Sequence, residues 1–235
     1  MGSNFLPDIE IVKSYPAINP PSTPSAVDSG KRTHALNWIG WSLVLGLLAY
    51  FVQKNVPRYF VFTPQSYGSY FWPRVTWLFP HVACGLLAVI IGPLQFWPRM
   101  RRDYLRAHRI AGRAYVVAVV AGSVASWGMA AKISGAPAYS MGLACLGLAW
   151  VTTTLMAFVA IRRKHLLQHR QWMVRSYVVT FAFVSFRLAD DLMGAAKILD
   201  SDERAKLLAW GCWAIPLLVT EVVLRAGAVF RGRQA

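Results

Sequence analysis

Two histidine–arginine pairs are the residues of this chain whose types and spacing best suit chemistry. His108-Arg109 and His169-Arg170 each close a copy of the pattern R-x-x-L-x-x-H-R. Histidine changes charge near neutral pH and is the commonest metal ligand, while arginine presents a fork of donors that matches a carboxylate or phosphate. Two such pairs on one face of a folded protein would be able to bind an anion or to ligate a metal from both sides.

The elements that must position these pairs are apolar segments long enough to cross a membrane. Hydrophobic residues make up 56% of the chain and charged residues 15%, and a hydrocarbon core of about 30 Å requires about 20 apolar residues in a helix. Six such runs are predicted as spans, at 36–53, 80–98, 112–131, 138–160, 173–193 and 206–224. They lack the charged face of an amphipathic helix, which excludes a soluble domain.

The two patterns belong to an internal repeat that runs through the second to fifth spans. Before each pair the same residue types recur at a fixed offset: Cys84, Leu87, Ala88, Leu94 and Arg101 match Cys145, Leu148, Ala149, Leu155 and Arg162. After one inserted residue, Arg113-Ala114-Tyr115 matches Arg175-Ser176-Tyr177. Such self-similarity indicates one helix–turn–helix unit used twice. Because both copies would cross the membrane in the same sense, a pseudo-twofold axis along the membrane normal would bring the His-Arg pairs together.

We therefore predict an all-α membrane protein with six transmembrane helices. Spans 2–5 form a four-helix core made of a tandem hairpin repeat, residues 80–131 and 138–193. Small residues recur every four positions in these spans and would let the helices approach closely in lipid. The predicted domains are a disordered, Pro/Ser-rich tail at 1–35, a transmembrane domain at 36–225 and a basic tail at 226–235.

Lysine and arginine gather on alternate connections, and this bias predicts the orientation. They are concentrated at Lys31-Arg32, Arg99–Arg113, Arg162–Arg175 and in the C-terminal tail. The positive-inside rule places these connections, both termini and both His-Arg pairs in the cytoplasm. The net charge of +15 then reflects topology and an attraction to the anionic headgroups of the lipid bilayer. Without a nucleic-acid-binding motif, it does not indicate nucleic acid as a partner.

The residues that would form a cytoplasmic site share a positive charge or an imidazole: His108, Arg109, Arg113, His169, Arg170 and Arg175. In one interpretation the arginines hold an anionic group and the histidines hydrogen-bond to it. In a second, the two histidines of the pairs ligate a haem iron from both sides. In a third, they cap helix starts and anchor to headgroups. No His-x-x-x-His spacing or carboxylate partner indicates a zinc site.

Two charged residues within spans are further candidates because a charge in lipid is costly. Glu221, in the sixth span, lies at the level of the arginines that begin spans three and five, where an ion pair would be a structural clamp or a functional carboxylate. Arg187, in the fifth span, lies near the outer boundary. Either Asp190 and Asp191 neutralise it locally, or His81, Arg187 and Asp191 form a small outer-face site.

The segment 55–79, between the first two spans, is crowded with aromatic residues and interrupted by prolines. Proline prevents a continuous helix, and aromatic side chains at this density suit the headgroup level of a membrane. The segment is therefore predicted to cap the outer side of the bundle. A substrate lid and a docking surface for a membrane protein partner are the alternatives.

Several phrases in the second half of the chain resemble one protein family. They are Gly92-Pro93-Leu94-Gln95-Phe96, His108-Arg109-x-x-Gly112-Arg113 and His169-Arg170-x-Trp172-Met173, together with His81, Arg187 and Glu221. About residues 78–225 resemble the bacterial multi-pass membrane proteins catalogued as domain of unknown function 2306. The resemblance implies an integral protein of the bacterial inner membrane with no established reaction, and it adds Gln95 to the candidate ligand-binding residues.

The function favoured by these observations is a binding or transport module for an anionic small molecule or lipid headgroup at the cytoplasmic His/Arg cradle. The first alternative is a redox membrane protein that carries b-type haem or uses quinones. The second is a non-catalytic accessory subunit of a membrane complex. No residue is assigned a catalytic role, and the sequence leaves open whether the protein is an enzyme.

Overall fold

A computed structural model describes residues 26–232, with side chains for 38–227, and its regular structure between these limits is entirely helical. The elements are α1 (Ala26–Asn55), η1 (Pro57–Phe60), α2 (Pro64–Phe71), η2 (Trp72–Arg74), α3 (Val75–Phe96), α4 (Pro98–Asp103), α5 (Leu105–Ala130), α6 (Pro137–Arg162), α7 (Leu166–Thr180), α8 (Ala182–Ala195) and α9 (Ser201–Gly232). Residues 1–25 of the predicted tail 1–35, and 233–235 of the tail 226–235, lie outside the described residues. The chain divides into two units, Met1–Leu43 and Val44–Ala235.

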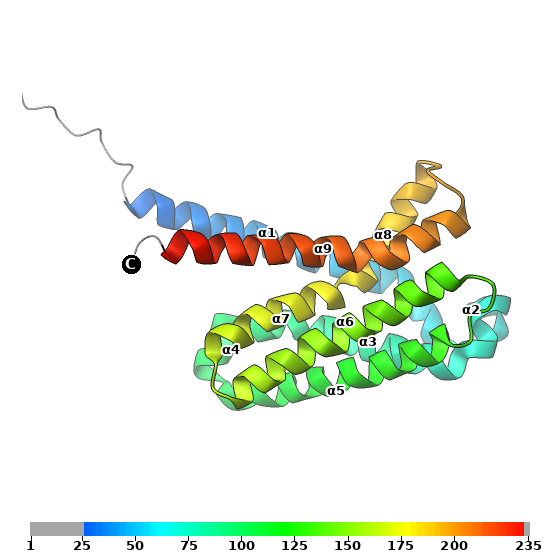
Figure 1. The fold of residues 1–235 in the computed structure, drawn as a ribbon, viewed down its shortest axis with the longest axis horizontal. Helices are drawn as coiled ribbons and strands as arrows, with labels where there is room; N and C mark the ends of the chain where they lie inside the picture. Colours follow the sequence, from blue (N-terminus) through cyan, green and yellow to red (C-terminus); the bar gives the residue numbers. More distant parts are fainter. Residues whose placement is uncertain (1–25, 233–235) are drawn as a thin grey trace, which may run out of the picture. The chain divides into compact units, whose positions relative to one another are not determined.

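The second unit is organised around four helices, α3, α5, α6 and α7, which run alongside one another (Figure 1). α3 packs against α5, α5 against α6 and α6 against α7, so α5 and α7 occupy diagonal positions. The buried core comes from all four helices: Ala88, Tyr115, Ala118, Val119, Trp150 and Val179. The prediction that spans 2–5 supply the core is confirmed by this cluster.

Four helices in the described part of the chain are long and apolar enough to cross a membrane: Pro64–Phe96, Leu105–Ala130, Pro137–Arg162 and Ser201–Gly227. They correspond to the second, third, fourth and sixth predicted spans. α9 buries Ala209 and Cys212 against the bundle, while Leu218 and Val222 are exposed. An apolar face of this kind is costly in water but favourable against lipid tails.

The predicted fifth span, 173–193, is not one helix. A turn at Phe181 separates α7 from α8, and α8 leaves the axis of α7 to pack against α9 (Figure 1). The hydroxyls on both sides of the turn donate to backbone carbonyls four residues earlier, Thr180 to Ser176 at 2.8 Å and Ser185 to Phe181 at 3.2 Å. Back-bonding of this type bends helices.

The two ends of the four-helix core differ in composition. We call the end where α3 and α6 finish and α5 and α7 begin the basic end, because its connections carry the arginines. The opposite end is called the aromatic end, because the segment from η1 to η2 covers it. Of the prolines expected to interrupt a helix there, Pro57, Pro64 and Pro73 each stand at the start of a short helical element, whereas Pro80 lies inside α3 and does not interrupt it.

The segment at the aromatic end is held by its own side chains. Tyr59, Tyr67 and Leu78 form a buried cluster, and the Tyr67 hydroxyl donates to the Tyr59 carbonyl. Phe62 meets the Phe79 ring with centroids 4.8 Å apart. These contacts make the segment a packed cap rather than an extended loop.

Candidate functional site

The histidines of the two repeated pairs come from α5 and α7 and lie near each other at the basic end. The hydroxyl of Tyr115 on α5 lies 2.8 Å from that of Ser176 on α7, and both side chains are fully buried. His108 and His169 each stand seven residues before one of these positions, which is two helical turns on the same helix face and about 10 Å along the axis. The two imidazoles therefore point into the same interior space at the basic end, close enough for electrostatic interaction.

The imidazole of His169 has a defined orientation. Its Nδ1 lies 2.9 Å from the carbonyl oxygen of Ala157 on α6, and a carbonyl only accepts, so Nδ1 carries the proton. The neutral ring then has its lone pair on Nε2. No hydrogen bond from another described residue reaches this Nε2.

Two buried nitrogen atoms near His169 lack partners among the described residues. They are Nδ1 of His108 and Nε2 of Gln95, whose side chain is only 6% exposed. The Gln95 amide lies beside Gly112, one turn beyond His108 on α5, because a Cβ added there would be 3.3 Å from Gln95 Oε1. An unpaired buried polar group costs about 1–3 kcal/mol, so such groups suggest a ligand position.

The structure separates the arginines of the predicted cradle from its histidines. Arg109, Arg113 and Arg170 are exposed, and no hydrogen bond or ion pair joins them to another described residue. Arg109 and Arg170 directly follow the inward-facing histidines, and one residue is a rotation of about 100° around a helix. Their side chains therefore leave the interior, where the histidines point.

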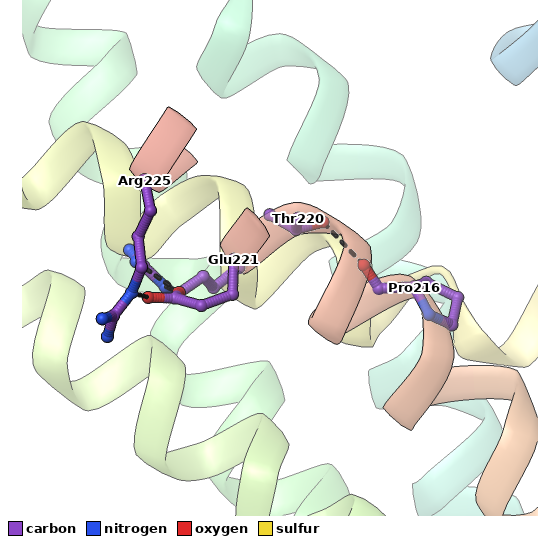
Figure 2. A network of polar contacts seen from close by, with 5 residues as sticks. Pro216, Thr220, Glu221 and Arg225 are labelled. Atoms are coloured by element: carbon purple, nitrogen blue, oxygen red, sulfur yellow. Dashed lines mark hydrogen bonds and ion pairs between the residues drawn. The ribbon is translucent and has the colours of Figure 1, made fainter. Parts of the chain in front are cut away.

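Arg175 forms the ion pair with Glu221 that the sequence predicted. Its Nε and Nη2 donate to one carboxylate oxygen of Glu221 at 2.9 and 2.6 Å, and Arg225 Nε donates to the other at 2.7 Å. Figure 2 shows the Glu221 carboxylate beside Arg225, with Pro216 and Thr220 earlier in the same helix. The Glu221 carboxylate is thereby used by two arginines and joins α9 to α7, which supports the clamp interpretation.

A buried network of hydroxyls lies between the two ends of the core. Thr180 Oγ1 accepts from Trp150 Nε1 at 2.7 Å and lies 2.7 Å from the Tyr115 hydroxyl, while Thr154 Oγ1 lies 2.6 Å from Ser176 Oγ. The sequence analysis did not identify this set. The sequence does contain a signal for this network. Trp150 and Thr154, and likewise Ser176 and Thr180, are polar residues four positions apart within apolar spans, so each pair lies on one face of its helix.

At the aromatic end the helices enclose a cavity of about 160 Å³. Most of its walls are apolar, and its lining residues come from the segment η1–η2 as well as from α1, α3, α5, α6, α7, α8 and α9. Its lining includes Val82, Leu86, Leu143, Leu146, Trp150, Phe183 and Cys212, with the polar groups Asn55, Arg74, His81, Tyr139 and Arg187. An apolar pocket with a few convergent polar groups is the usual form of a small-molecule site. We call it the aromatic-end pocket.

His81 is held in this pocket by a backbone contact. Its Nδ1 lies 2.9 Å from the carbonyl of Gly122 on α5 and must donate to it. The Phe183 ring packs on the imidazole with centroids 4.8 Å apart. As in His169, the neutral ring has a lone pair on Nε2, and no described residue bonds to that nitrogen.

Arg187 lines the same pocket, and no ion pair joins it to a carboxylate of the described residues. Asp190 instead accepts from Arg204 at 3.0 Å, and Asp191 from Lys54 at 2.7 Å. His81 and Arg187 both line the aromatic-end pocket, while Arg187 and Asp191 both line a second, smaller pocket, in which Asp191 has Lys54 as its ion-pair partner. The contacts of Arg187 are a long one to the Tyr59 hydroxyl, at 3.5 Å, and the Phe186 ring, 5.7 Å from its guanidinium carbon.

Arg74 is the second guanidinium of the pocket. It donates to the carbonyl oxygens of Tyr70 and Lys132, while its Nε is buried without a partner among the described residues. The hydrogen bonds of both arginines to described residues go to neutral oxygens, the backbone carbonyls for Arg74 and the Tyr59 hydroxyl for Arg187. No group of three or more His, Cys, Asp or Glu in the part of the chain that the structure describes could hold a metal ion.

Comparison with known proteins identifies the family. A family model described as "Predicted membrane protein (DUF2306)" matches residues 78–224, which is more than half of the 235 residues. Comparison with curated proteins and with solved structures finds no match. The matched range contains the four-helix core, both facing histidines, most of the pocket and the Arg175–Glu221 pair. The chain therefore belongs to the DUF2306 family of membrane proteins.

Proposed function

We propose that this membrane protein binds an amphipathic anion, with the charged head at Arg187 and the apolar body in the aromatic-end pocket. The observation that carries the proposal is a half-buried guanidinium on the wall of an apolar cavity, with no carboxylate partner among the described residues. A charge removed from water requires a counter-charge, and a bound carboxylate or phosphate would supply it. Arginine suits this role because its planar fork matches both anions.

The size of the pocket limits the body of the ligand. Its volume of about 160 Å³ is close to the cavity of about 150 Å³ that holds a benzene molecule in an engineered protein. The innermost part of the ligand is therefore a single ring or a short stretch of alkyl chain. A fatty acid or a lipid phosphate meets both requirements.

This proposal keeps the class of ligand expected from the sequence and moves its site to the other end of the bundle. At the basic end, Arg175 already has Glu221 as its counter-charge. The exposed Arg109, Arg113 and Arg170 are suited to the phosphates of the bilayer, each contributing about 1 kcal/mol near an anionic surface. We propose that they anchor headgroups rather than select a ligand.

The proposed topology has six spans, with α1 and the α7–α8 pair added to the four apolar helices. The lysine and arginine bias supports a cytoplasmic basic end, cytoplasmic termini and residence in the bacterial inner membrane. Ser134→Cys, in the connection between α5 and α6, should react with an impermeant maleimide added to intact cells. Lys164→Cys, between α6 and α7, should react only after the cells are opened, and the reverse pattern would contradict this orientation.

The ligand proposal is tested with dodecanoate as the probe, on protein in phosphatidylcholine nanodiscs analysed by native mass spectrometry. Arg187→Gln removes the charge but keeps much of the side-chain length. A charge-assisted hydrogen bond contributes about 1.5–3 kcal/mol, so this variant should bind dodecanoate about 10- to 100-fold more weakly. Dodecanol, which lacks the carboxylate, should bind weakly to both forms.

Arg109→Gln is the matched control, because it removes the same charge from an exposed position at the basic end. Its affinity for dodecanoate should stay within about twofold of that of the unmodified protein. Leu146→Trp should fill the pocket and weaken both probes. Equal loss in the two arginine variants, or equal binding of dodecanoate before and after Arg187→Gln, would refute a site at Arg187.

A further inference from the structure

We propose that the head of the ligand in the aromatic-end pocket is a phosphate monoester, bound as a dianion between Arg58 and Arg187 and beside the Tyr59 hydroxyl. The inference rests on the proposed function, because it keeps Arg187 as the residue that binds the head and the pocket as the place of the apolar body. It selects the phosphate from the two anions that Arg187 alone would accept, and it adds Arg58 and Tyr59 to the site.

Tyr59 brings the two guanidinium groups together. Its hydroxyl oxygen accepts a hydrogen bond from Arg58 Nη2 at 2.7 Å and another from Arg187 Nη2 at 3.5 Å. Arg58 is also held over the ring of its neighbour, with its guanidinium carbon 4.7 Å from the centroid of the Tyr59 ring. Two positive charges that are far apart in the sequence therefore lie within one hydrogen bond of the same oxygen atom.

The Tyr59 hydroxyl still has a hydrogen to donate. A phenol oxygen both accepts and donates, whereas an arginine nitrogen only donates, so neither contact of this oxygen uses its hydrogen. No described residue accepts that hydrogen, although Tyr59 is only 6% exposed. Buried hydroxyls are nearly always paired. The cluster of Arg58, Tyr59 and Arg187 thus consists of donors, and it suits a group that only accepts.

The charge of this cluster favours a dianion. No ion pair joins Arg58 or Arg187 to a carboxylate of the described residues, and the two aspartates of α8 are engaged in the pairs Arg204–Asp190 and Lys54–Asp191. A carboxylate would offset one of the two guanidinium charges. A phosphate monoester carries a charge of about −1.5 to −2 at pH 7 and three strong acceptor oxygens. Both its charge and its number of acceptors match the cluster.

The position of the cluster suits the phosphate of a lipid. Tyr59 and Arg187 line the aromatic-end pocket, whereas Arg58 is exposed and belongs to η1, in the aromatic segment that suits the headgroup level of a membrane. A head bound here would lie at the rim of the pocket, between a half-buried and an exposed arginine. An alkyl chain attached to it would enter the apolar part of the cavity, which a soluble phosphate compound would leave unused.

The test compares two probes on protein in phosphatidylcholine nanodiscs, by native mass spectrometry. Dodecyl phosphate has a dianionic head, and dodecyl methyl phosphate has the same chain but a diester head with a single charge. The unmodified protein should bind dodecyl phosphate about fivefold more tightly, the factor that corresponds to an ion pair with one exposed partner. Arg58→Gln removes the exposed charge, so this variant should bind the two probes with affinities within about twofold of each other.

Lys132→Gln is the matched control. Lys132 is exposed in the connection between α5 and α6, at the same end of the bundle, and no hydrogen bond or ion pair joins its ammonium group to another described residue. The variant therefore removes the same charge without removing a donor of the cluster, and the preference for dodecyl phosphate should remain. Dodecanol should bind equally to the unmodified protein, Arg58→Gln and Lys132→Gln, which shows that the pocket is intact in each.

Tyr59→Phe tests the hydroxyl separately and keeps the buried ring. It should weaken both phosphate probes about tenfold, because each accepts a charge-assisted hydrogen bond from this group. Undiminished binding of both probes by Tyr59→Phe would exclude the hydroxyl from the site and contradict the proposed geometry.

The remaining outcomes separate this inference from the proposed function. Equal binding of the two probes by the unmodified protein, or a preference that survives Arg58→Gln, would overturn the phosphate assignment, while weaker dodecanoate binding by Arg187→Gln would still support the proposed function. Undiminished binding of dodecanoate and dodecyl phosphate by Arg187→Gln would contradict both. Inorganic phosphate distinguishes the two sources of the head. If it displaces dodecyl phosphate at equal concentration, the site belongs to a soluble phosphate compound and the lipid is excluded.

Discussion

The aromatic end of the four-helix core encloses an apolar cavity, whereas the basic end presents two inward imidazoles and a buried amide. In the first region the polar groups are carried on the wall of an otherwise apolar space, at Arg74, His81 and Arg187. In the second, buried nitrogens of Gln95 and His108 lack hydrogen-bond partners among the described residues, and His169 bonds to a backbone carbonyl. The first arrangement suits a ligand that enters with an apolar body.

The two ends also treat their arginines differently. Arg175 at the basic end has its side chain 13% exposed and shares Glu221 with Arg225. Arg187 at the aromatic end is similarly withdrawn from solvent, yet the nearby carboxylates pair with Arg204 and Lys54. This difference teaches that a charge in a span is a functional candidate only after its partners are known. A charge such as that of Arg175, which another side chain of the protein neutralises, has a structural role.

The largest predicted effect separates close packing at Gly92, near the C-terminal end of α3, from looser packing at Gly85, beside the aromatic-end pocket. Gly92 and Gly85 lie seven residues apart on one face of α3. A Cβ at Gly92 would overlap the buried Tyr177 ring, whereas at Gly85 it would lie 3.0 Å from the Phe183 ring, which borders the cavity and can move into it. Gly92→Ala should destabilise the protein by about 1–3 kcal/mol or more, and Gly85→Ala by less than about 1 kcal/mol.

Unfolding in detergent, followed by helical circular dichroism, measures both glycine variants. Alanine has the better helix propensity at either position, so propensity cannot produce the difference. Equal destabilisation by the two substitutions would show that the pocket wall at Gly85 is as rigid as the packing around Gly92, and would contradict this part of the comparison.

The next largest effect concerns the hydroxyl network between the two ends. Tyr115→Phe leaves the hydroxyls of Ser176 and Thr180 without the partner that they share. Hydrogen bonds between membrane helices average about 0.6 kcal/mol and reach about 1.7 kcal/mol, so a loss of about 1–2 kcal/mol is expected. The same unfolding assay should give a smaller loss for Tyr177→Phe, whose hydroxyl makes a long bond of 3.4 Å to Val89. A larger loss for Tyr177→Phe would contradict the assignment of the network to Tyr115.

The sequence was sufficient for features that depend on the number and type of consecutive residues. Four of the predicted spans coincide with long apolar helices, because apolar run length directly reflects membrane thickness. It did not reveal the break at Phe181, because that depends on which hydroxyl bonds to which carbonyl. The apolar run continues across the turn without a proline or glycine.

The candidate sites were predictable to different degrees for the same reason. The expectation that His108 and His169 lie near each other came from the internal repeat, which can be read from the order of residues alone. The aromatic-end pocket could not be found in this way, since a cavity is the volume left between side chains of several helices. Asp190 and Asp191 have the spacing to neutralise Arg187, but tertiary packing brings Arg204 and Lys54 to them instead.

A smaller effect distinguishes the two arginines that share Glu221. Arg175→Gln removes two hydrogen bonds between α7 and α9 from a site where the arginine side chain is 13% exposed. Arg225→Gln removes one bond from a side chain that is 80% exposed. Exposed pairs contribute little, so the first variant should lower the melting temperature more than the second. A larger shift in Arg225→Gln would place the clamp within α9 rather than between helices.

The smallest effect is the dependence on pH of the ion pair at the aromatic end. Lys54, which follows the predicted span 36–53, donates to Asp191 at 2.7 Å. The hydrogen bond to Asp191, and then that to Tyr50, raise the pKa of Lys54 above its ordinary value of 10.5. Because the folded state holds this proton more tightly, the pair stabilises it fully below pH 10.5 and less as the pH rises through the raised pKa. Asp191→Asn should therefore lower the melting temperature slightly at pH 8, and its difference from the unmodified protein should shrink at alkaline pH.

Asp103→Asn, which removes the 2.8 Å contact with Arg102 at the basic end, is the control. Arginine keeps its charge throughout this range, so the difference for Asp103→Asn should not follow the titration of a lysine. A difference for Asp191→Asn that stays constant as the pH rises would mean that Lys54 is not the partner that carries the charge of this pair.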